Sequence, residues 1–220
     1  MLVSRIMKRN PIFVRPELSL TEARSIMDKE KIGHLPVLNK NNELVGLITK
    51  GDLLKAAPSS ATTLDVYELS YLLSKLTVDK VMTKNIVSVQ ENEVIEEAAR
   101  IMADRNIGCL PVLKESFLVG LVTDTDIFHF FINAFGARHK GVRVTINFLD
   151  RAGQLSAFTG AITEKGGNIV SFVTSEGDDA AHRFGTLKIT DISLADVEAV
   201  TKDCLKTVIL QGSELEDIRE

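Results

Sequence analysis

Two short motifs with the same spacing carry the side chains best suited to bind a polar ligand. Each places a threonine three residues before an aspartate, as Thr49 with Asp52 and as Thr123 with Asp126. An ionised carboxylate accepts hydrogen bonds from two hydroxyl donors, and a threonine hydroxyl beside helical N–H groups suits an anion. The same spacing is typical of a capping box, in which such side chains satisfy the first N–H groups of a helix. Capping alone does not show that either motif takes a phosphate, so both interpretations stay open.

Both motifs lie in a duplicated stretch, since the sequence around the first recurs around the second. Residues 32–54 and 107–128 share Gly-x-Leu-Pro-Val-Leu and Gly-Leu-(Ile/Val)-Thr-x-x-Asp. In each copy the apolar spacing predicts a strand, a helix, two strands joined by a polar turn, and a helix that follows the threonine. The first strands are expected at residues 12–14 and 87–89. Each copy is therefore interpreted as a β-α-β-β-α unit.

Two apolar helices are expected beside these units. Residues 56–78 form an insertion with a helical rhythm of apolar residues, too apolar for a linker in solution. The helix expected at residues 126–135 is apolar on nearly every side, so it must be covered on more than one face. Closed twofold association is the commonest way to cover such faces, and we therefore expect a homodimer.

The C-terminal part predicts a second domain beyond the polar connection at residues 136–141. Strands are expected at residues 142–149, 168–174, 183–190 and 207–211, and helices at 154–165 and 194–205. The order β-α-β-β-α-β is that of the split-βαβ, ferredoxin-like fold. This domain is expected to span residues 142–212, followed by a frayed acidic tail at 213–220. The whole chain is thus assigned to the α+β class.

Composition excludes several function classes. The 220 residues are 45% hydrophobic with a net charge of −4, and no Lys/Arg run gives the clustered basic footprint of a nucleic-acid binder. No apolar stretch is long enough to span a membrane and none follows Met1 as a signal sequence, so a cytoplasmic protein is expected. Cys109 and Cys204 are far apart in sequence and are expected to be buried thiols. No histidine has the spacing of a metal site or a catalytic triad, so neither catalytic residues nor metal ligands nor a cofactor is predicted.

The doubled unit, with Gly-x-Leu-Pro-Val-Leu and Gly-Leu-(Ile/Val)-Thr-x-x-Asp in each copy, resembles a tandem pair of cystathionine β-synthase (CBS) domains. The resemblance places one repeat at residues 1–55 and the other at 79–135, and it implies a pseudo-twofold disc with two clefts. Such clefts commonly hold adenosine ligands such as AMP, ADP, ATP or S-adenosylmethionine. A regulatory role as a ligand-sensing protein without catalysis follows from the resemblance.

The resemblance also implies roles for individual residues. The hydroxyls of Thr49 and Thr123 would meet phosphate, and the carboxylates of Asp52 and Asp126 would accept the ribose hydroxyls. The adenine would be framed by backbone at and near Ile12, Val87, Gly33, His34, Leu35, Pro36, Gly108, Cys109, Leu110 and Pro111.

The chain departs from the family pattern one residue before each aspartate. Many CBS pairs carry arginine there, whereas this chain has Gly51 and Thr125, so a phosphate counter-charge is missing from both motifs. Lys50 is a candidate to replace it in one cleft, while Asp124 would repel phosphate in the other. His34 faces the phosphate in one interpretation and is a core-edge histidine in another, and Cys109 at the matching place has a packing role as its alternative.

The C-terminal domain resembles an ACT domain, a small regulatory module that often binds amino acids. The resemblance rests on the first loop, where Asp150, Arg151, Gly153 and Leu155 match the family's acid, x, x, Gly, x, Leu pattern. The alternative is a tight strand-to-helix turn required by the fold alone. A CBS pair followed by an ACT domain is similar to the acetoin-utilisation regulatory proteins of bacteria. A passive dimerisation or interaction scaffold, regulating a metabolic enzyme or transporter without a small ligand, remains the alternative function.

Overall fold

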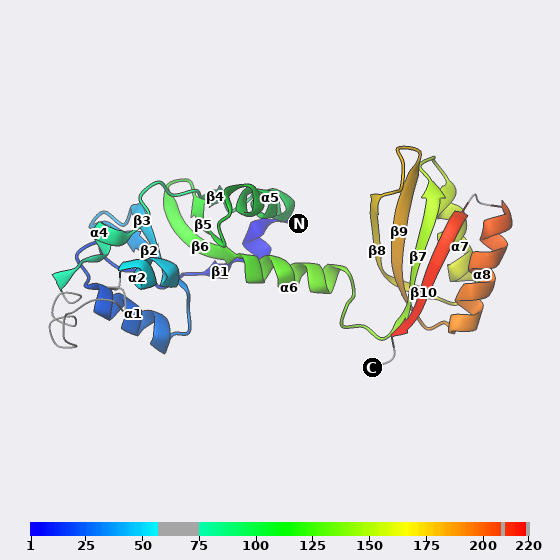
Figure 1. Cartoon of the computed structure of the whole chain (residues 1–220), viewed down its shortest axis with the longest axis horizontal. Coiled ribbons are helices and arrows are strands. Elements are labelled where there is room, and N and C mark those ends of the chain that lie inside the picture. The colour runs from blue at the N-terminus through cyan, green and yellow to red at the C-terminus, as the bar shows by residue number, and fades with distance from the viewer. Residues whose placement is uncertain (57–74, 208–209, 219–220) are drawn as a thin grey trace. The chain divides into compact units, whose positions relative to one another are not determined.

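The computed structural model describes residues 1–56, 75–207 and 210–218. It divides into two compact units, Met1–Phe128 and His129–Glu220 (Figure 1). Each unit is considered by itself below. Most of the helix predicted within residues 56–78 lies outside the described residues.

The first repeat contains a helix and a hairpin in the predicted order. Helix α1 (Leu20–Lys29) begins at a complete capping box, in which the Ser19 hydroxyl accepts a hydrogen bond from the backbone N–H of Glu22. The antiparallel strands β2 (His34–Leu38) and β3 (Leu44–Thr49) lead into α2 (Lys50–Ala56). Apolar side chains of α1 and the hairpin meet in one core that includes Met27 and Ile48. The strand predicted at residues 12–14 is reduced to a single bridge from Val14 to Val37.

The second repeat has the same order. It consists of β4 (Val89–Gln90), α5 (Ile95–Arg105), β5 (Cys109–Lys114), β6 (Phe117–Thr123) and α6 (Asp124–Ala134). Strand β4 pairs in parallel with β5, and β5 pairs antiparallel with β6. Helix α6 begins two residues before the predicted start, at the residue that follows Thr123.

The segment that leads into each repeat packs on the other repeat. Strand β1 (Lys8–Arg9), which follows the short 3-10 helix η1 (Val3–Arg5), pairs antiparallel with β6 of the second repeat (Figure 1). Conversely, α4 (Val78–Val81) precedes the second repeat, yet the N–H of Val78 donates to the Leu18 carbonyl at 2.9 Å. The two repeats are therefore joined by exchanged backbone pairing.

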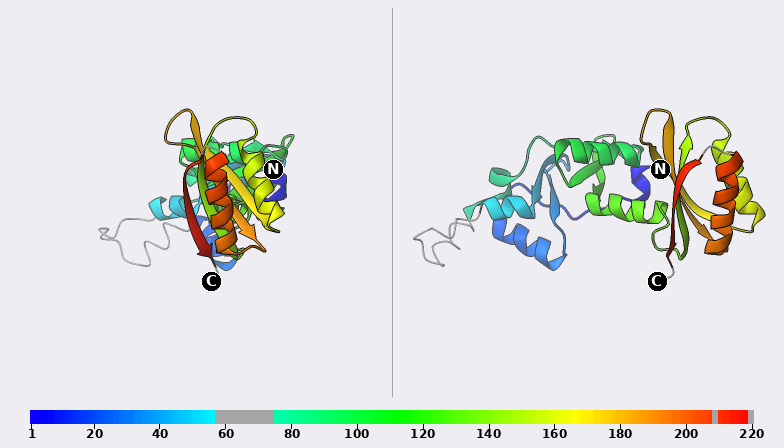
Figure 2. Two further views of the ribbon diagram at one scale, coloured as in Figure 1. Left: turned by 90° about the vertical axis from the view of Figure 1, so that its right-hand side faces the viewer. Right: turned by 45° about the vertical axis from the view of Figure 1, so that its right-hand side comes forward.

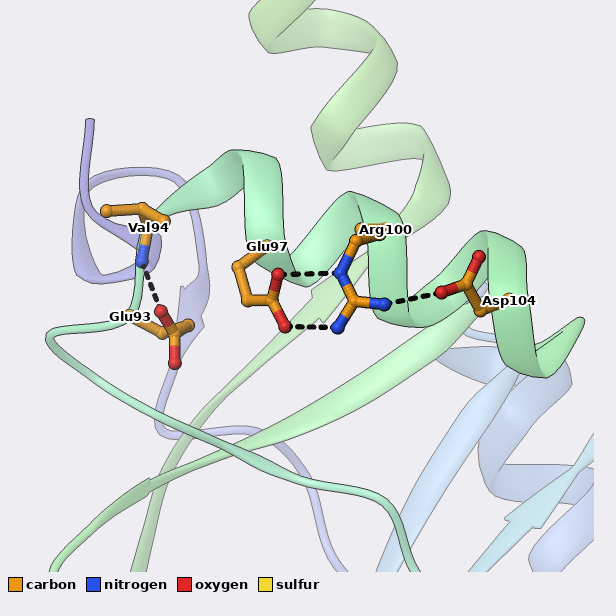
Figure 3. A network of polar contacts seen from close by, with 5 residues as sticks. All are labelled: Glu93, Val94, Glu97, Arg100 and Asp104. Atoms are coloured by element: carbon orange, nitrogen blue, oxygen red, sulfur yellow. Dashed lines mark hydrogen bonds and ion pairs between the residues drawn. The ribbon is translucent and has the colours of Figure 1, made fainter.

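Charged side chains on α5 form their own network at the surface. Arg100 binds both carboxylate oxygens of Glu97, at 2.6 and 2.8 Å, and contacts Asp104 one turn further along the helix (Figure 3). These hydrogen bonds lower the pKa of the Glu97 carboxyl. The charges are mutually satisfied and solvent-exposed, so they make a surface network and not a ligand site.

The second unit is a four-stranded antiparallel sheet with two helices on one face (Figure 2). Its strands lie in the order β10-β7-β9-β8, which is the arrangement of the split-βαβ fold. Side chains from β7, β9 and both helices close the core, with Phe158, Ile146 and Ile189 almost fully buried. The elements are β7 (Gly141–Leu149), α7 (Gln154–Glu164), β8 (Asn168–Glu176), β9 (His182–Thr190), α8 (Leu194–Thr207) and β10 (Leu210–Ile218).

The prediction of a frayed acidic tail is wrong for residues 213–218. Strand β10 continues through them, and its register with β7 runs from Ser213 opposite Ile146 to Ile218 opposite Gly141. Backbone pairing along β7 satisfies the N–H and carbonyl groups of this segment whatever its side chains are. Charged side chains are common on such edge strands, so acidity did not indicate disorder here.

Candidate functional site

The Thr49 motif forms a closed capping arrangement at the start of α2. The Thr49 hydroxyl and its backbone N–H both donate to Oδ2 of Asp52, at 2.8 and 2.9 Å. In return, the N–H of Asp52 donates to the Thr49 hydroxyl at 3.1 Å. The predicted cap is therefore confirmed, and it occupies one carboxylate oxygen while leaving Oδ1 of Asp52 without a donor among the described residues.

The Thr123 motif repeats this geometry at the start of α6. The Thr123 hydroxyl donates to Oδ2 of Asp126 at 2.7 Å, the Thr123 N–H donates to the same oxygen at 2.9 Å, and the Asp126 N–H returns a bond of 3.3 Å. The two caps are thus equivalent in their local hydrogen bonding. What distinguishes them is the space around each.

A cleft of about 570 Å³ lies between the two repeats of the first unit and contains the Thr49 motif. Its size is within the range of small-molecule sites, which are typically about 300–1,000 Å³. Residues of both repeats line it: Gly33, His34, Leu47, Thr49, Lys50, Gly51, Asp52, Lys55, Thr83, Asn85, Ile86, Val87, Asn106, Ile107, Gly108 and Cys109.

The cleft brings together about half of the residues predicted to bind a ligand. From the first repeat it includes Gly33, His34, Lys50 and the Thr49 motif, and from the second it includes Val87 and the Gly108–Cys109 corner. Other predicted residues are not part of its lining: Ile12, Leu35, Pro36, Leu110, Pro111, Thr123 and Asp126. Leu35 and Leu110 are fully buried in their strands because both side chains face a core, and Ile12 is 42% exposed.

His34 lies in the cleft with carboxylates from both repeats near it. Its side chain is half-buried, and removal from water lowers its pKa, while the negative charges of Asp124 and Asp52 act in the opposite direction. Burial dominates, because it is the larger of these effects. His34 is therefore a neutral hydrogen-bonding group at neutral pH and not a fixed counter-charge for phosphate.

The Gly108 corner of the second repeat places a thiol in the lining of the cleft and a carboxylate beside it. Cys109 is buried, and its burial together with the charges of Asp126 and Asp124 raises the pKa of the thiol to about 12. A Cβ at Gly108 would lie 3.0 Å from Oδ2 of Asp124. This carboxylate is partly occupied locally, because the Thr125 N–H donates to its Oδ1 at 2.6 Å.

The lysine predicted as a counter-charge is held by an acid outside the cleft. Lys50 Nζ lies 3.3 Å from Oδ1 of Asp28 on α1, and Arg24 approaches the other oxygen of Asp28 at 3.8 Å. Lys55, further along α2, also lines the cleft and is exposed. It makes no ion pair with any residue that the structure describes.

The predicted ligand loop of the second unit is a tight turn between β7 and α7. Gly153 caps the helix with a φ of +89°, a left-handed conformation that favours glycine. The N–H of Asp150 donates to the Ala181 carbonyl at 2.8 Å, and its carboxylate lies 3.6 Å from Arg183. Leu155 packs against the core, whereas Arg151 is exposed. The positions of these side chains are those that a strand-to-helix turn requires.

Comparison with known proteins identifies the first unit. The family model of the CBS domain matches residues 3–59 and 78–133, just over half of the chain. The chain belongs to the CBS-domain family. The matched ranges contain both capping motifs and all the residues that line the cleft between the two repeats.

Two curated relatives match this chain over a small part of their own length. L-aspartate semialdehyde sulfurtransferase of Methanocaldococcus jannaschii is 32% identical over 131 residues, which is 59% of this chain and 23% of that protein. Homoserine O-acetyltransferase of Methanohalobium evestigatum is 33% identical over 126 residues, or 57% of this chain and 23% of the enzyme. The chain therefore spans less than a quarter of the length of these relatives.

Solved structures show the same CBS pair. The CBS domain pair of protein MJ0100, in complex with 5′-methylthioadenosine and S-adenosyl-L-methionine, is 31% identical with a TM-score of 0.51, covering 63% of this chain and 98% of that one. A putative acetoin utilization protein (AcuB) from Vibrio cholerae is 30% identical with a TM-score of 0.52, covering 63% and 95%.

Several residues of the CBS cleft were not predicted from sequence. Thr83, Asn85 and Ile86 reach it because the segment leading into the second repeat crosses onto the first, as the bridge between Leu47 and Thr83 shows. Asn106 has a φ of +51° and ends α5 at the rim. The sequence did indicate the helix end at Asn106, since asparagine is enriched in the left-handed conformation that ends helices.

The described residues supply neither a metal cluster nor a membrane span. Within them, no three or more His, Cys, Asp or Glu side chains are grouped to hold a metal ion. Their helices are also too short or too polar to cross a bilayer.

Proposed function

We propose that the chain is a regulatory, non-catalytic ligand sensor whose CBS pair binds an adenosyl ligand in the cleft at Thr49 and Asp52. The observation that carries this proposal is the cleft itself, which joins the Thr49 motif of one repeat to Val87 and Gly108 of the other. A related CBS pair has been solved with 5′-methylthioadenosine and S-adenosyl-L-methionine, so a ligand of this class suits the fold.

The cap leaves Asp52 able to take the role proposed for it. Only Oδ2 is engaged by Thr49, and Oδ1 remains to accept a ribose hydroxyl. A hydrogen bond to a charged group such as the Asp52 carboxylate contributes roughly 1.5–3 kcal/mol. The side chain of Asp52 is half-buried, which reduces competition from water for this bond. Val87 and Ile107 supply apolar surface for the base.

Thermal unfolding with a panel of ligands tests the proposal. The panel contains AMP, ADP, ATP, S-adenosylmethionine and 5′-methylthioadenosine, and at least one should raise the midpoint, because a ligand that binds only the folded chain stabilises it. At a hundredfold excess over Kd the gain is about 2.7 kcal/mol.

Asp52→Asn and Asp126→Asn form a matched pair for the same experiment. Both change an equivalent cap, but only Asp52 lines the described cleft. Loss of the ligand response in Asp52→Asn, with the cap penalty common to both variants, supports the site. A chain that responds to no member of the panel would favour the alternative, an interaction scaffold that regulates an enzyme or transporter without a ligand.

We propose that the second unit is an ACT-like domain with a loop for an amino acid at Asp150, Arg151, Gly153 and Leu155. Its support is the β-α-β-β-α-β order and the left-handed Gly153, which lets backbone approach a ligand. Calorimetry with the common amino acids tests this proposal, and Gly153→Val should abolish any binding found. The similarity to a putative acetoin utilization protein of Vibrio cholerae supports a proposed role in acetoin utilisation. We further propose a cytoplasmic location and a regulated target protein as partner.

We also propose that the protein is a homodimer. Phe128 and Phe135 of the apolar α6 region are 63% and 44% exposed in the single chain, and such side chains are commonly covered by association. Light scattering should give about twice the chain mass of 24.2 kDa. A particle of the single-chain mass at micromolar concentration would contradict this proposal.

A further inference from the structure

The charges of the cleft are unevenly distributed. Two cations, Lys50 and Lys55, line it from α2, and Asp52 is the one acidic residue among the described lining residues. The next carboxylate, Asp124, lies at the Gly108 corner contributed by the other repeat. An anionic group in this cleft is therefore attracted toward α2 and repelled from the Gly108 corner.

The two lysines differ in how available they are. Lys50 is paired with Asp28 at 3.3 Å, but both side chains are at least half exposed, and ion pairs exposed to water are weak. A phosphate can therefore compete with Asp28 for Lys50. Lys55 has no ion-pair partner among the described residues, so its charge is open to a ligand.

Position along α2 relates Lys55 to the proposed ribose site. Asp52 and Lys55 are three residues apart, and helical residues at this spacing lie on the same face. Lys50 and Lys55 are separated by about 7.5 Å of helical rise, taken as ~1.5 Å for each residue. This is the axial separation of the two backbone positions. Because both flexible side chains line the cleft, it allows the two ammonium groups to contact different phosphates of a chain of two or three.

We propose that this cleft selects an adenosine ligand with two or three phosphates, and that Lys55 together with Lys50 binds the phosphate chain. The inference rests on the adenosyl site proposed above and adds its chemical class. A neutral ligand such as 5′-methylthioadenosine offers no anionic group to either ammonium. The sulfonium of S-adenosylmethionine would bring a third positive charge toward them.

Titration calorimetry with adenosine, AMP, ADP, ATP and S-adenosylmethionine in magnesium-free buffer tests this inference. In the wild type, ATP should bind at least about tenfold more tightly than adenosine, because charged hydrogen bonds are added with each phosphate. Lys55→Ala should weaken the binding of ATP about fivefold to tenfold and leave the affinity for adenosine within about twofold of the wild type. Lys55→Arg should restore most of the ATP affinity, since it keeps the charge.

Lys40→Ala is the matched control. Lys40 is an exposed lysine of the β2–β3 turn that does not line the cleft, so its loss should change ATP affinity less than about twofold. Raising the salt concentration should weaken the binding of ATP but not the binding of adenosine. Circular dichroism checks that each variant is folded.

The outcomes separate this inference from the proposed function. Equal affinities for adenosine and ATP, or tighter binding of S-adenosylmethionine than of ATP, would overturn the phosphate selectivity while leaving an adenosyl site in place. An unchanged ATP affinity in Lys55→Ala would overturn the role of that lysine. Binding of no adenosyl compound at all would overturn the proposed function itself.

Discussion

The side chain of Met82 lies against Gly46, at the point where the segment leading into the second repeat crosses β3 of the first. Met7 lies against Gly120 at the equivalent place in the second repeat. Each methionine fills space that a Cβ on the facing glycine would require. The two contacts therefore fasten the exchanged leading segments to the hairpins that they cover.

Replacing either glycine with alanine should destabilise the first unit. At Gly46 the new Cβ would overlap Cγ and Sδ of Met82, and at Gly120 it would meet Met7 together with the Lys8 carbonyl at 3.1 Å. Overpacking of this kind costs typically about 1–3 kcal/mol. The Gly120 variant should lose more, because backbone moves less easily than a methionine side chain.

Urea unfolding measures these losses, and Gly160→Ala is the control. Gly160 is an exposed residue of α7, and no atom lies within 4 Å of the position that a Cβ would take there. Alanine there should stabilise the helix by about 0.5–1 kcal/mol. Gly46→Ala and Gly120→Ala variants as stable as the wild type would show that the methionines are free to move aside.

The order of elements within each repeat was predictable, whereas the exchange of leading segments was not. Repeated letters and apolar periodicity indicated the helices and hairpins, and the Thr-x-x-Asp spacing indicated the caps that the structure contains. Because Met7 and Met82 occupy equivalent positions in similar repeats, the same pattern fits a segment packed on its own repeat or on the other. Only long-range backbone pairing decides between them.

The cleft was predictable in part for the same reason. Its Thr49 motif and Gly33–His34 corner are local features, so their spacing could be recognised. Thr83 and Asn85 belong to the exchanged segment, so their place in the cleft depends on long-range packing. Lys55 is a lysine of a short helix, and no sequence motif marks it as a cleft residue. The pairing of β10 with β7 was also missed beyond residue 211, since edge-strand pairing depends on backbone groups that any sequence possesses.

Removing the Thr123 hydroxyl should destabilise the start of α6. Thr123→Ala loses the 2.7 Å bond to Asp126 and the bond that the Asp126 N–H donates in return. Loss of a cap of this type costs about 0.5–2 kcal/mol. Urea unfolding should show this loss, and Thr123→Ser should recover most of it. A serine variant as unstable as the alanine variant would assign the effect to the lost methyl group.

Cys109 should be unreactive while the chain is folded. Its thiol is buried, and with a pKa of about 12 only about one molecule in ten thousand is thiolate at pH 8. In a Cys204→Ser variant, which leaves one thiol, an aromatic disulfide reagent should label Cys109 slowly in buffer and rapidly in urea. Rapid labelling of the folded variant would show that the cleft opens widely enough to expose and ionise this thiol.

The free energy of unfolding should depend on pH through His34. The ordinary pKa of histidine is 6.5, and burial lowers the pKa of His34 below this value in the folded chain. Just below pH 6.5 the unfolded chain therefore binds a proton that the folded chain does not yet bind. Stability is therefore fully present above about pH 6.5 and decreases as the pH falls toward the lowered value. Below that value both states are protonated, and the loss contributed by His34 stops.

Two measurements check this prediction. Urea unfolding between pH 5 and 7.5 should give a shallower pH dependence for His34→Gln than for the wild type, since glutamine keeps a polar group in the cleft but does not titrate. NMR titration of the His34 ring should give a midpoint below 6.5. A midpoint above that value would mean that Asp124 and Asp52 outweigh burial. His34 would then be cationic in the cleft, the sign of its contribution would reverse, and stability would be lost as the pH rises.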